Sequence, residues 1–560
     1  MKFLILSGCT LVAALMSGAA ALAQTAPTAD PSVVEAQPLQ SLDLFSAAGR
    51  ATGLRPDLWR GASADLARAA FQGLGARPLE PGISQLARDV LATGATAPDS
   101  AGGDNDLAAD RVMALVRLGD IEAARAILAR TPGLPSRVRL SQAAAEAALW
   151  TGDPKHACAI GDSLAEGRDG VFWLRLRAFC LAQAGKGEEA QLALDLAPPT
   201  AVHDPALSRL LAARVSGTIN PGAATADTAL GYALSRSLKL DGASAVSSAG
   251  VPGLISMASD ETATPELRRL AAWRLISTGI DAPEAIRAAL LLPTPAVDPA
   301  GPGKSSRRKG VSRVSHPVAG PQEQAVALAR LYVAARSAAD PLERARALAS
   351  LLRSDSAAGF RTLSVVTAPE LALVEPQGLS PGDRLVLAVA ASTVDAPSAQ
   401  GLRDSLKVDE PGAVSPADMA ILDAIHAAGS PEHAVGEVLD RLIDQGDRFA
   451  VADRSRAQAA AAILFGIINP KPTPLSSMAR ARLAAFQPGP AQHVAGALLA
   501  ETAVERQAAG EVALLTLIAS SADNLGAADR ALLLRALSRV GLGRQARSIA
   551  MDGLIPLIRR

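Results

Sequence analysis

Three copies of the pattern Gly-x-x-x-x-Ala lie at equal intervals in the first half of this 560-residue chain. They run from Gly119 to Ala124, from Gly152 to Ala157 and from Gly185 to Ala190, so each glycine follows the one before by 33 residues. A fixed period between about 20 and 50 residues is the signature of stacked supersecondary units. The spacing therefore predicts a repeat fold.

Each copy is typical of two amphipathic helices joined by a tight turn. Apolar residues lie at helical spacing before Gly119, and Ile127 and Leu128 continue the spacing after it. Glycine suits the turn because the residue that ends a helix commonly takes the left-handed conformation. We expect the alanine to lie where the two helices cross most closely. The same junction recurs from Gly429 to Ala434 and from Gly541 to Ala546.

These copies resemble the tetratricopeptide family, in which helix-turn-helix units of about 34 residues stack into a superhelix. The likeness is clearest over residues 105–197. The large aromatic residue expected early in each first helix is absent, and Ala108, Ser141 and Leu174 stand in its place. The resemblance implies an all-α solenoid of stacked hairpins.

The first residues form a secretory signal peptide. Lys2 precedes an apolar run from Phe3 to Ala21, and the small-x-small end at Ala21–Ala23 predicts cleavage between Ala23 and Gln24. A lipoprotein pattern ends at Cys9, but too short an apolar region precedes it, so an outer-membrane lipoprotein is the less favoured alternative. A retained membrane anchor is a third alternative.

Composition indicates the compartment. Arginine is preferred over lysine, and alanine, glycine and proline are abundant, which is typical of a GC-rich bacterial genome. Cleavage would leave Cys158 and Cys180 as an even pair in an oxidising compartment. We therefore expect a periplasmic protein with a Cys158–Cys180 disulfide; the alternative is two thiols on separate faces.

The chain divides into five predicted segments. A run rich in proline, glycine and basic residues in the middle is typical of a disordered linker. The predicted layout is a signal peptide at 1–23, a flexible tether at 24–40, a helical region at 41–292, the linker at 293–321 and a second helical region at 322–560.

Bulk charge and composition exclude nucleic acid as a partner. The chain has 55 basic and 55 acidic residues, and only 3% of its residues are aromatic. Nucleic acid would need a basic field and stacking platforms, so we expect none to bind. After signal removal the longest apolar run is 459–468, about half the length of a spanning helix, so we expect no transmembrane segment.

Two short patterns imitate catalytic motifs. The run Gly301–Ser305 resembles a phosphate-binding loop, but Asp298 stands where its first glycine belongs, and no strand precedes it. Ser306 and Lys309 have the Ser-x-x-Lys spacing of some acyl-transfer enzymes, but that chemistry needs a helix N-terminus in a pocket. A basic, proline-rich linker provides neither a strand before a phosphate-binding loop nor a helix N-terminus in a pocket.

The sequence identifies no catalytic, cofactor-binding or metal-ligating residue. Of the six histidines only His426 and His433 are near one another, and Gly429–Pro431 interrupts the helix between them. Trp150 and Trp173 lie within the repeat helices, where we expect them in the core.

We therefore expect a non-enzymatic periplasmic scaffold or adaptor that binds protein partners in the cell envelope, because solenoids present extended surfaces and need no catalytic centre. One alternative is a peptidoglycan-associated superhelix similar to the helical part of lytic transglycosylases. Another is a structural envelope protein that self-associates.

Overall fold

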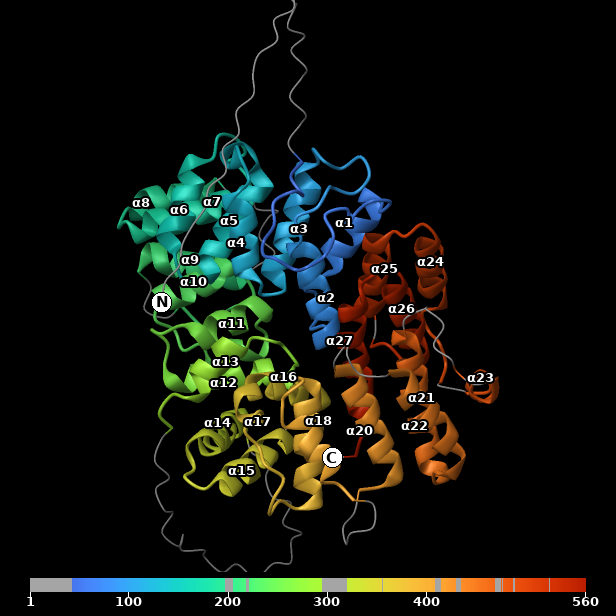
Figure 1. Ribbon diagram of the computed structural model, residues 1–560. Helices are drawn as coiled ribbons and strands as arrows, with labels where there is room; N and C mark the ends of the chain where they lie inside the picture. The colour runs from blue at the N-terminus through green and yellow to red at the C-terminus, as the bar shows by residue number, and fades with distance from the viewer. Residues whose placement is uncertain are drawn as a thin grey trace, which may run out of the picture. The chain divides into compact units, whose positions relative to one another are not determined.

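The described part of the chain consists of α-helices joined by short connections (Figure 1). The computed structural model describes residues 43–196, 205–217, 221–294, 320–354, 356–407, 414–429, 435–468, 475, 477–486, 489–522 and 524–559. These ranges contain 27 α-helices, and their only strand-like contact is one isolated parallel bridge between Ser63 and Asp99. The predicted all-α fold is confirmed.

Several predictions made from the sequence fall outside the described ranges. They concern the signal peptide with its cleavage site at Ala23 and Gln24, the tether, Ala434, His433, the runs Gly301–Ser305 and Ser306–Lys309, and nearly all of the linker 293–321. The helices on either side of that linker are α13 (Pro283–Leu290) and α14 (Pro321–Ser337). Their bounds lie close to the predicted ends of the linker.

Polar caps and prolines begin many of the helices. Ser63, Asp104 and Thr264 accept hydrogen bonds from amides of the turn that they precede, as N-cap residues do. The helices before the linker are α1 (Ala64–Gly73), α2 (Pro81–Ala92), α3 (Asn105–Arg117), α4 (Ile121–Ala129), α5 (Val138–Trp150), α6 (Pro154–Ser163), α7 (Val171–Gln183), α8 (Gly187–Asp195), α9 (Pro205–Ser216), α10 (Ala229–Ser237), α11 (Val251–Ser259), α12 (Pro265–Ser277) and α13.

The helices after the linker follow the same plan. They are α14, α15 (Pro341–Arg353), α16 (Ala357–Val366), α17 (Ala368–Leu371), α18 (Pro381–Thr393), α19 (Ala399–Asp404), α20 (Pro416–Gly429), α21 (Val435–Gln445), α22 (Val451–Ile467), α23 (Ser477–Ala484), α24 (Val494–Glu505), α25 (Ala509–Ala522), α26 (Ala527–Arg539) and α27 (Gly543–Leu554). No helix in the described ranges combines the length and the apolar character that a bilayer-crossing segment needs.

The predicted repeat 105–197, described up to residue 196, contains three successive helical hairpins, α3 with α4, α5 with α6 and α7 with α8. Gly119, Gly152 and Gly185 end the first helix of each with φ values of 76°, 76° and 77°. The residue after each glycine donates its amide to a carbonyl five positions earlier at 2.9 Å, as Asp120 does to Leu115. The helix is thus capped by a residue in the left-handed conformation, which glycine adopts without the steric cost that a side chain would add.

The alanines of four of the five patterns are fully buried, and the fifth, Ala434, lies outside the described ranges. Ala124, Ala157, Ala190 and Ala546 are each 0% exposed. A larger side chain at these positions would have to be accommodated in a close-packed interior, where overpacking is destabilising. A small residue at these positions therefore suits close packing of the helices around it.

The same cap recurs where the sequence pattern did not reveal it. Lys239 and Gln507 both take φ of 55°, and the amides of the residues that follow them reach back to Ser235 and Ala503 at 3.0 Å. Gly279 completes an equivalent turn, as does Gly541, where the sequence pattern predicted one. A search for glycine alone misses the first two because a non-glycine residue accepts the left-handed conformation there.

Gly429 has a different role from the one that the sequence predicted. It is the last residue of α20, and its φ is not positive. A Cβ added there would lie 2.4 Å from the carbonyl oxygen of Ser392 on α18. Gly429 is therefore a packing glycine that lets α20 approach α18 closely, and not a turn of the repeat type.

Helices from the two ends of the described chain pack against each other. α2 contacts α27, and α1 contacts α25 (Figure 1). The approach of α2 to α27 is close, because a Cβ added to Gly82 would lie 2.6 Å from the carbonyl oxygen of Ser548. Periodicity gives no indication of this contact, since in a simple solenoid each repeat touches only its neighbours.

Cys158 on α6 and Cys180 on α7 form the predicted disulfide. Their Cα atoms are 5.8 Å apart, and both side chains are partly buried against the core. The bond joins the second helix of one repeat to the first helix of the next. It therefore fixes the stacking of two hairpins and not the turn within one.

We expect the double substitution Cys158→Ser and Cys180→Ser to lower the free energy of unfolding by about 3 kcal/mol, because it releases a closed loop in the unfolded chain. Urea unfolding followed by circular dichroism measures the change. Reduction of the wild-type protein is the matched control and should give the same loss. An unchanged unfolding free energy in both samples would contradict a structural role for the bond.

Candidate functional site

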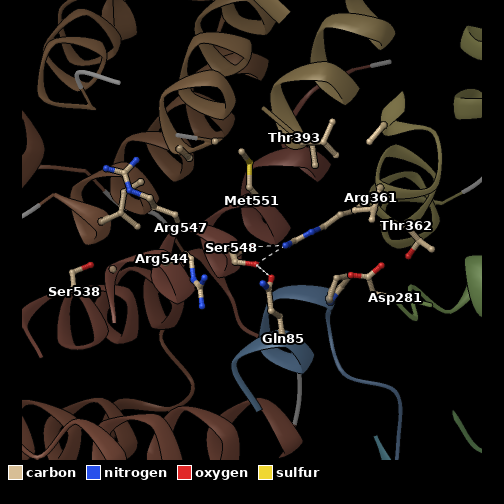
Figure 2. A pocket seen from close by; sticks show the side chains of 18 of the residues that line it. Gln85, Asp281, Arg361, Thr362, Thr393, Ser538, Arg544, Arg547, Ser548 and Met551 are labelled. Carbon is tan, nitrogen blue, oxygen red and sulfur yellow. Dashed lines mark hydrogen bonds between the residues drawn. The ribbon is translucent and has the colours of Figure 1, made fainter. Parts of the chain in front are cut away.

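A cleft of about 920 Å³ lies where α2 meets helices from the second half of the chain (Figure 2). Its walls come from α2, α16, α17, α18, α20, α22, α27, the end of α26, the turn before α27 and the connection between α12 and α13. The residues in contact with the space are Pro81, Gln85, Asp281, Arg361, Thr362, Val365, Ala368, Thr393, Val394, Ala428, Gly429, Ile467, Ser538, Gly541, Gly543, Arg544, Arg547, Ser548 and Met551. Of the repeat residues predicted from sequence, Gly429 and Gly541 belong to this cleft.

One face of α27 forms a continuous wall. Arg544, Arg547, Ser548 and Met551 occupy positions i, i+3, i+4 and i+7, so they lie on the same side of the helix. The arginines lie toward the N-terminal end of this wall, and the apolar Met551 lies toward its C-terminal end. The wall can therefore contact both a charged and an apolar group of a ligand.

Arg361 on α16 joins that wall to the rest of the cleft (Figure 2). Its guanidinium donates to the carbonyl oxygen and to Oγ of Ser548, each at 2.6 Å, and forms an ion pair with Asp552. Ser548 Oγ in turn donates to Oε1 of Gln85 at 2.8 Å. These bonds connect α2, α16 and α27 in one polar network.

Asp552 is the buried anchor of the network. Its side chain is 4% exposed, and Oδ2 accepts the amide of Gly82 at 2.7 Å. Burial raises the pKa of the Asp552 carboxyl, and the neighbouring Arg361 guanidinium opposes that rise. Arg361 and the Gly82 amide thus compensate for the removal of the carboxylate from water.

The guanidinium groups of Arg544 and Arg547 donate hydrogen bonds to main-chain carbonyl oxygens outside α27. Arg544 donates to the carbonyl of Thr52 at 2.7 Å and lies 3.4 Å from Oδ2 of Asp89, while its side chain remains 65% exposed. Arg547 donates to the carbonyl of Ala427 near the end of α20 at 3.0 Å. Burial lowers the pKa of Arg547, but an arginine stays protonated at physiological pH.

Two smaller clefts lie near the N-terminal repeats. One of about 770 Å³ lies at the disulfide between α6 and α7 and is lined by Trp173, by the basic residues Lys155, Arg168, Arg177 and Lys186 and by one carboxylate, that of Asp162. The other, of about 760 Å³, lies beside the turns at Gly119 and Gly152 and has Asp120, Glu122, Asp260, Asp281, Glu261 and Glu284 with one arginine, Arg236. Each is built from helices of the first half of the chain.

The tryptophans occupy the positions predicted for them. Trp150 and Trp173 are 6% and 5% exposed, and Trp150 stacks on Tyr232 with a centroid distance of 5.9 Å. His426 lies on α20 with Nδ1 3.4 Å from Oγ of Ser392. Across the described ranges no three His, Cys, Asp or Glu residues are grouped as a metal site would require.

Sequence reasoning missed most of the cleft. Arg361 and Asp552 are 191 positions apart, and Gly82 and Asp552 are 470 apart. No local motif marks any of these residues. The one usable signal was the turn at Gly541. It predicts where α27 starts, but it does not predict which helices α27 packs against.

The chain matches no protein-family model, and neither a curated protein nor a solved structure matches it.

We expect Asp552→Asn to lower the free energy of unfolding by about 3–5 kcal/mol, because it leaves the Arg361 guanidinium buried without its counter-charge. Urea unfolding measures the loss. Glu189→Gln breaks the exposed ion pair with Lys186 and should leave the unfolding free energy almost unchanged. Equal effects of the two substitutions would contradict the anchoring role of Asp552.

Proposed function

We propose that this protein is a non-catalytic helical-repeat scaffold of the bacterial cell envelope and that it binds a protein partner in the cleft between α2, α16 and α27. The observation that supports this most directly is the composition of the cleft wall. Arginines, hydroxyl groups and aliphatic side chains recognise a ligand through hydrogen bonds and apolar contact. They supply the contacts of a binding surface.

The geometry of the polar groups also favours recognition. Ser548 Oγ is held between Arg361 and Gln85, and Arg361 is held by Asp552. Groups fixed in this way lose little conformational freedom when a ligand binds. A rigid wall of this kind suits a binding site.

An envelope location agrees with the disulfide. Disulfides persist in oxidising compartments such as the periplasm, and the signal peptide predicted at 1–23 would direct the chain there. The proposal therefore includes export of the chain and a partner protein in the cell envelope.

A photo-crosslinking amino acid in place of Gln85 tests the proposal. Gln85 is exposed at the edge of the cleft, so we expect it to form discrete adducts with a protein from envelope extracts. Mass spectrometry identifies the adduct, and the captured protein, made separately, should bind the wild-type chain in solution. The same photo-crosslinker at Arg125, which is exposed on α4 away from the cleft, is the matched control and should form none.

Peptidoglycan provides the opposing test. The purified protein should release no soluble glycan fragments from isolated peptidoglycan. Release of such fragments, or equal adducts from the Gln85 and Arg125 positions, would contradict a scaffold that binds through this cleft.

A further inference from the structure

The N-terminal end of α27 faces the cleft without a side-chain cap. Leu542 is its N-cap residue, and no side chain accepts a hydrogen bond from the first amides. Gly541 and Gly543 both line the cleft, and a Cβ added to either would meet no atom within 4 Å. A ligand can therefore approach the backbone here, where amide donors and the helix dipole favour a negative charge.

Two arginines stand directly beside this terminus. Arg544 and Arg547 belong to the first two turns of α27, and Figure 2 shows both on the cleft wall. Arg361 also lines the space, but the buried Asp552 balances its charge, so Arg544 and Arg547 are the arginines that can offer positive charge to a ligand; Asp281 is the one carboxylate among the lining residues. Guanidinium groups form strong, charge-assisted hydrogen bonds with carboxylates.

A buried hydroxyl in the α16 wall gives an independent indication of a ligand. Thr362 is 1% exposed and lines the cleft, and its Oγ1 has no hydrogen-bond partner in the part of the chain that the structure describes. A buried polar group without a partner is costly, so such groups are rare in folded proteins. A ligand oxygen that accepts from Thr362 would remove that cost.

Size and apolar lining indicate a peptide. Val365, Val394, Ile467 and Met551 line the cleft together with the polar groups. A space of about 920 Å³ holds a few residues of an extended chain and is too small for a folded domain. The apolar side chains can pack against apolar side chains of the ligand, while the arginines form ion pairs with its carboxylates.

We propose that the cleft binds an acidic peptide segment of the protein partner, with one carboxylate at the N-terminus of α27 beside Arg544 and an apolar side chain against Val365 and Met551. This inference rests on the proposed function and names the chemistry of its partner. A basic segment is disfavoured, because it would meet the guanidinium groups of Arg544 and Arg547 and only one lining carboxylate, that of Asp281.

The probe is a short labelled peptide that alternates glutamate with valine or leucine, and its binding to the purified full-length protein is followed by fluorescence anisotropy. We expect it to bind at least about tenfold more tightly than the same peptide with glutamine in place of glutamate. The preference should weaken as salt is added. A glutamine peptide with a free C-terminal carboxylate distinguishes recognition of a chain end from recognition of an acidic side chain.

Variants locate the binding to the cleft. Arg544→Gln should weaken binding of the glutamate peptide about tenfold, whereas Arg125→Gln removes the same charge from an exposed position on α4 and should leave it unchanged. Thr362→Val should weaken binding severalfold without lowering the free energy of unfolding, which a purely structural role would not produce. Equal affinity for the glutamate and glutamine peptides, or equal losses in Arg544→Gln and Arg125→Gln, would overturn the inference.

The two proposals fail in different ways. If Gln85 crosslinks to a protein that binds in solution but the glutamate peptide shows no preference, the scaffold function stands and the acidic partner is wrong. If the crosslinks are also absent, the scaffold function is wrong as well.

Discussion

The buried carboxylate of Asp552 joins three parts of the chain that lie far apart in sequence. It pairs with Arg361 on α16 and accepts the amide of Gly82 at the start of α2, while its own helix, α27, ends close to the C-terminus. A carboxylate removed from water needs such partners, since an unpaired buried charge costs several kcal/mol. The contact therefore specifies which helices must meet, and the close approach at Gly82 specifies how near they come.

This junction links the fold to the proposed function. Stacked hairpins are stabilised mainly by contacts between neighbours, which leaves each part of the stack largely independent. The contact of α2 with α27 adds a non-local constraint. Because the cleft takes its walls from both helices, it exists only while they are held together, and Arg361 and Ser548 serve the junction and the cleft at once.

The local features of the fold could be predicted from the sequence, and the non-local ones could not. The three hairpins, the left-handed glycines at 119, 152 and 185 and the buried alanines follow from spacing and from the steric needs of one turn. The disulfide was predicted from the even pair of cysteines that signal cleavage would leave in an oxidising compartment. Lys239 and Gln507 were missed because their left-handed conformation leaves no glycine to find. Arg361 and Asp552 were missed because no period or motif relates residues so distant in the chain.

Hydrogen exchange followed by mass spectrometry tests the junction most directly, with Gly82→Ala compared against Gly73→Ala. Both glycines lie in helices, but a Cβ at Gly73 meets nothing within 4 Å, whereas one at Gly82 meets the main chain of α27. The account predicts that α2 and α27 lose protection together in Gly82→Ala and keep it in Gly73→Ala, because the two helices open as one unit. Faster exchange in α2 alone, with α27 unchanged, would contradict it.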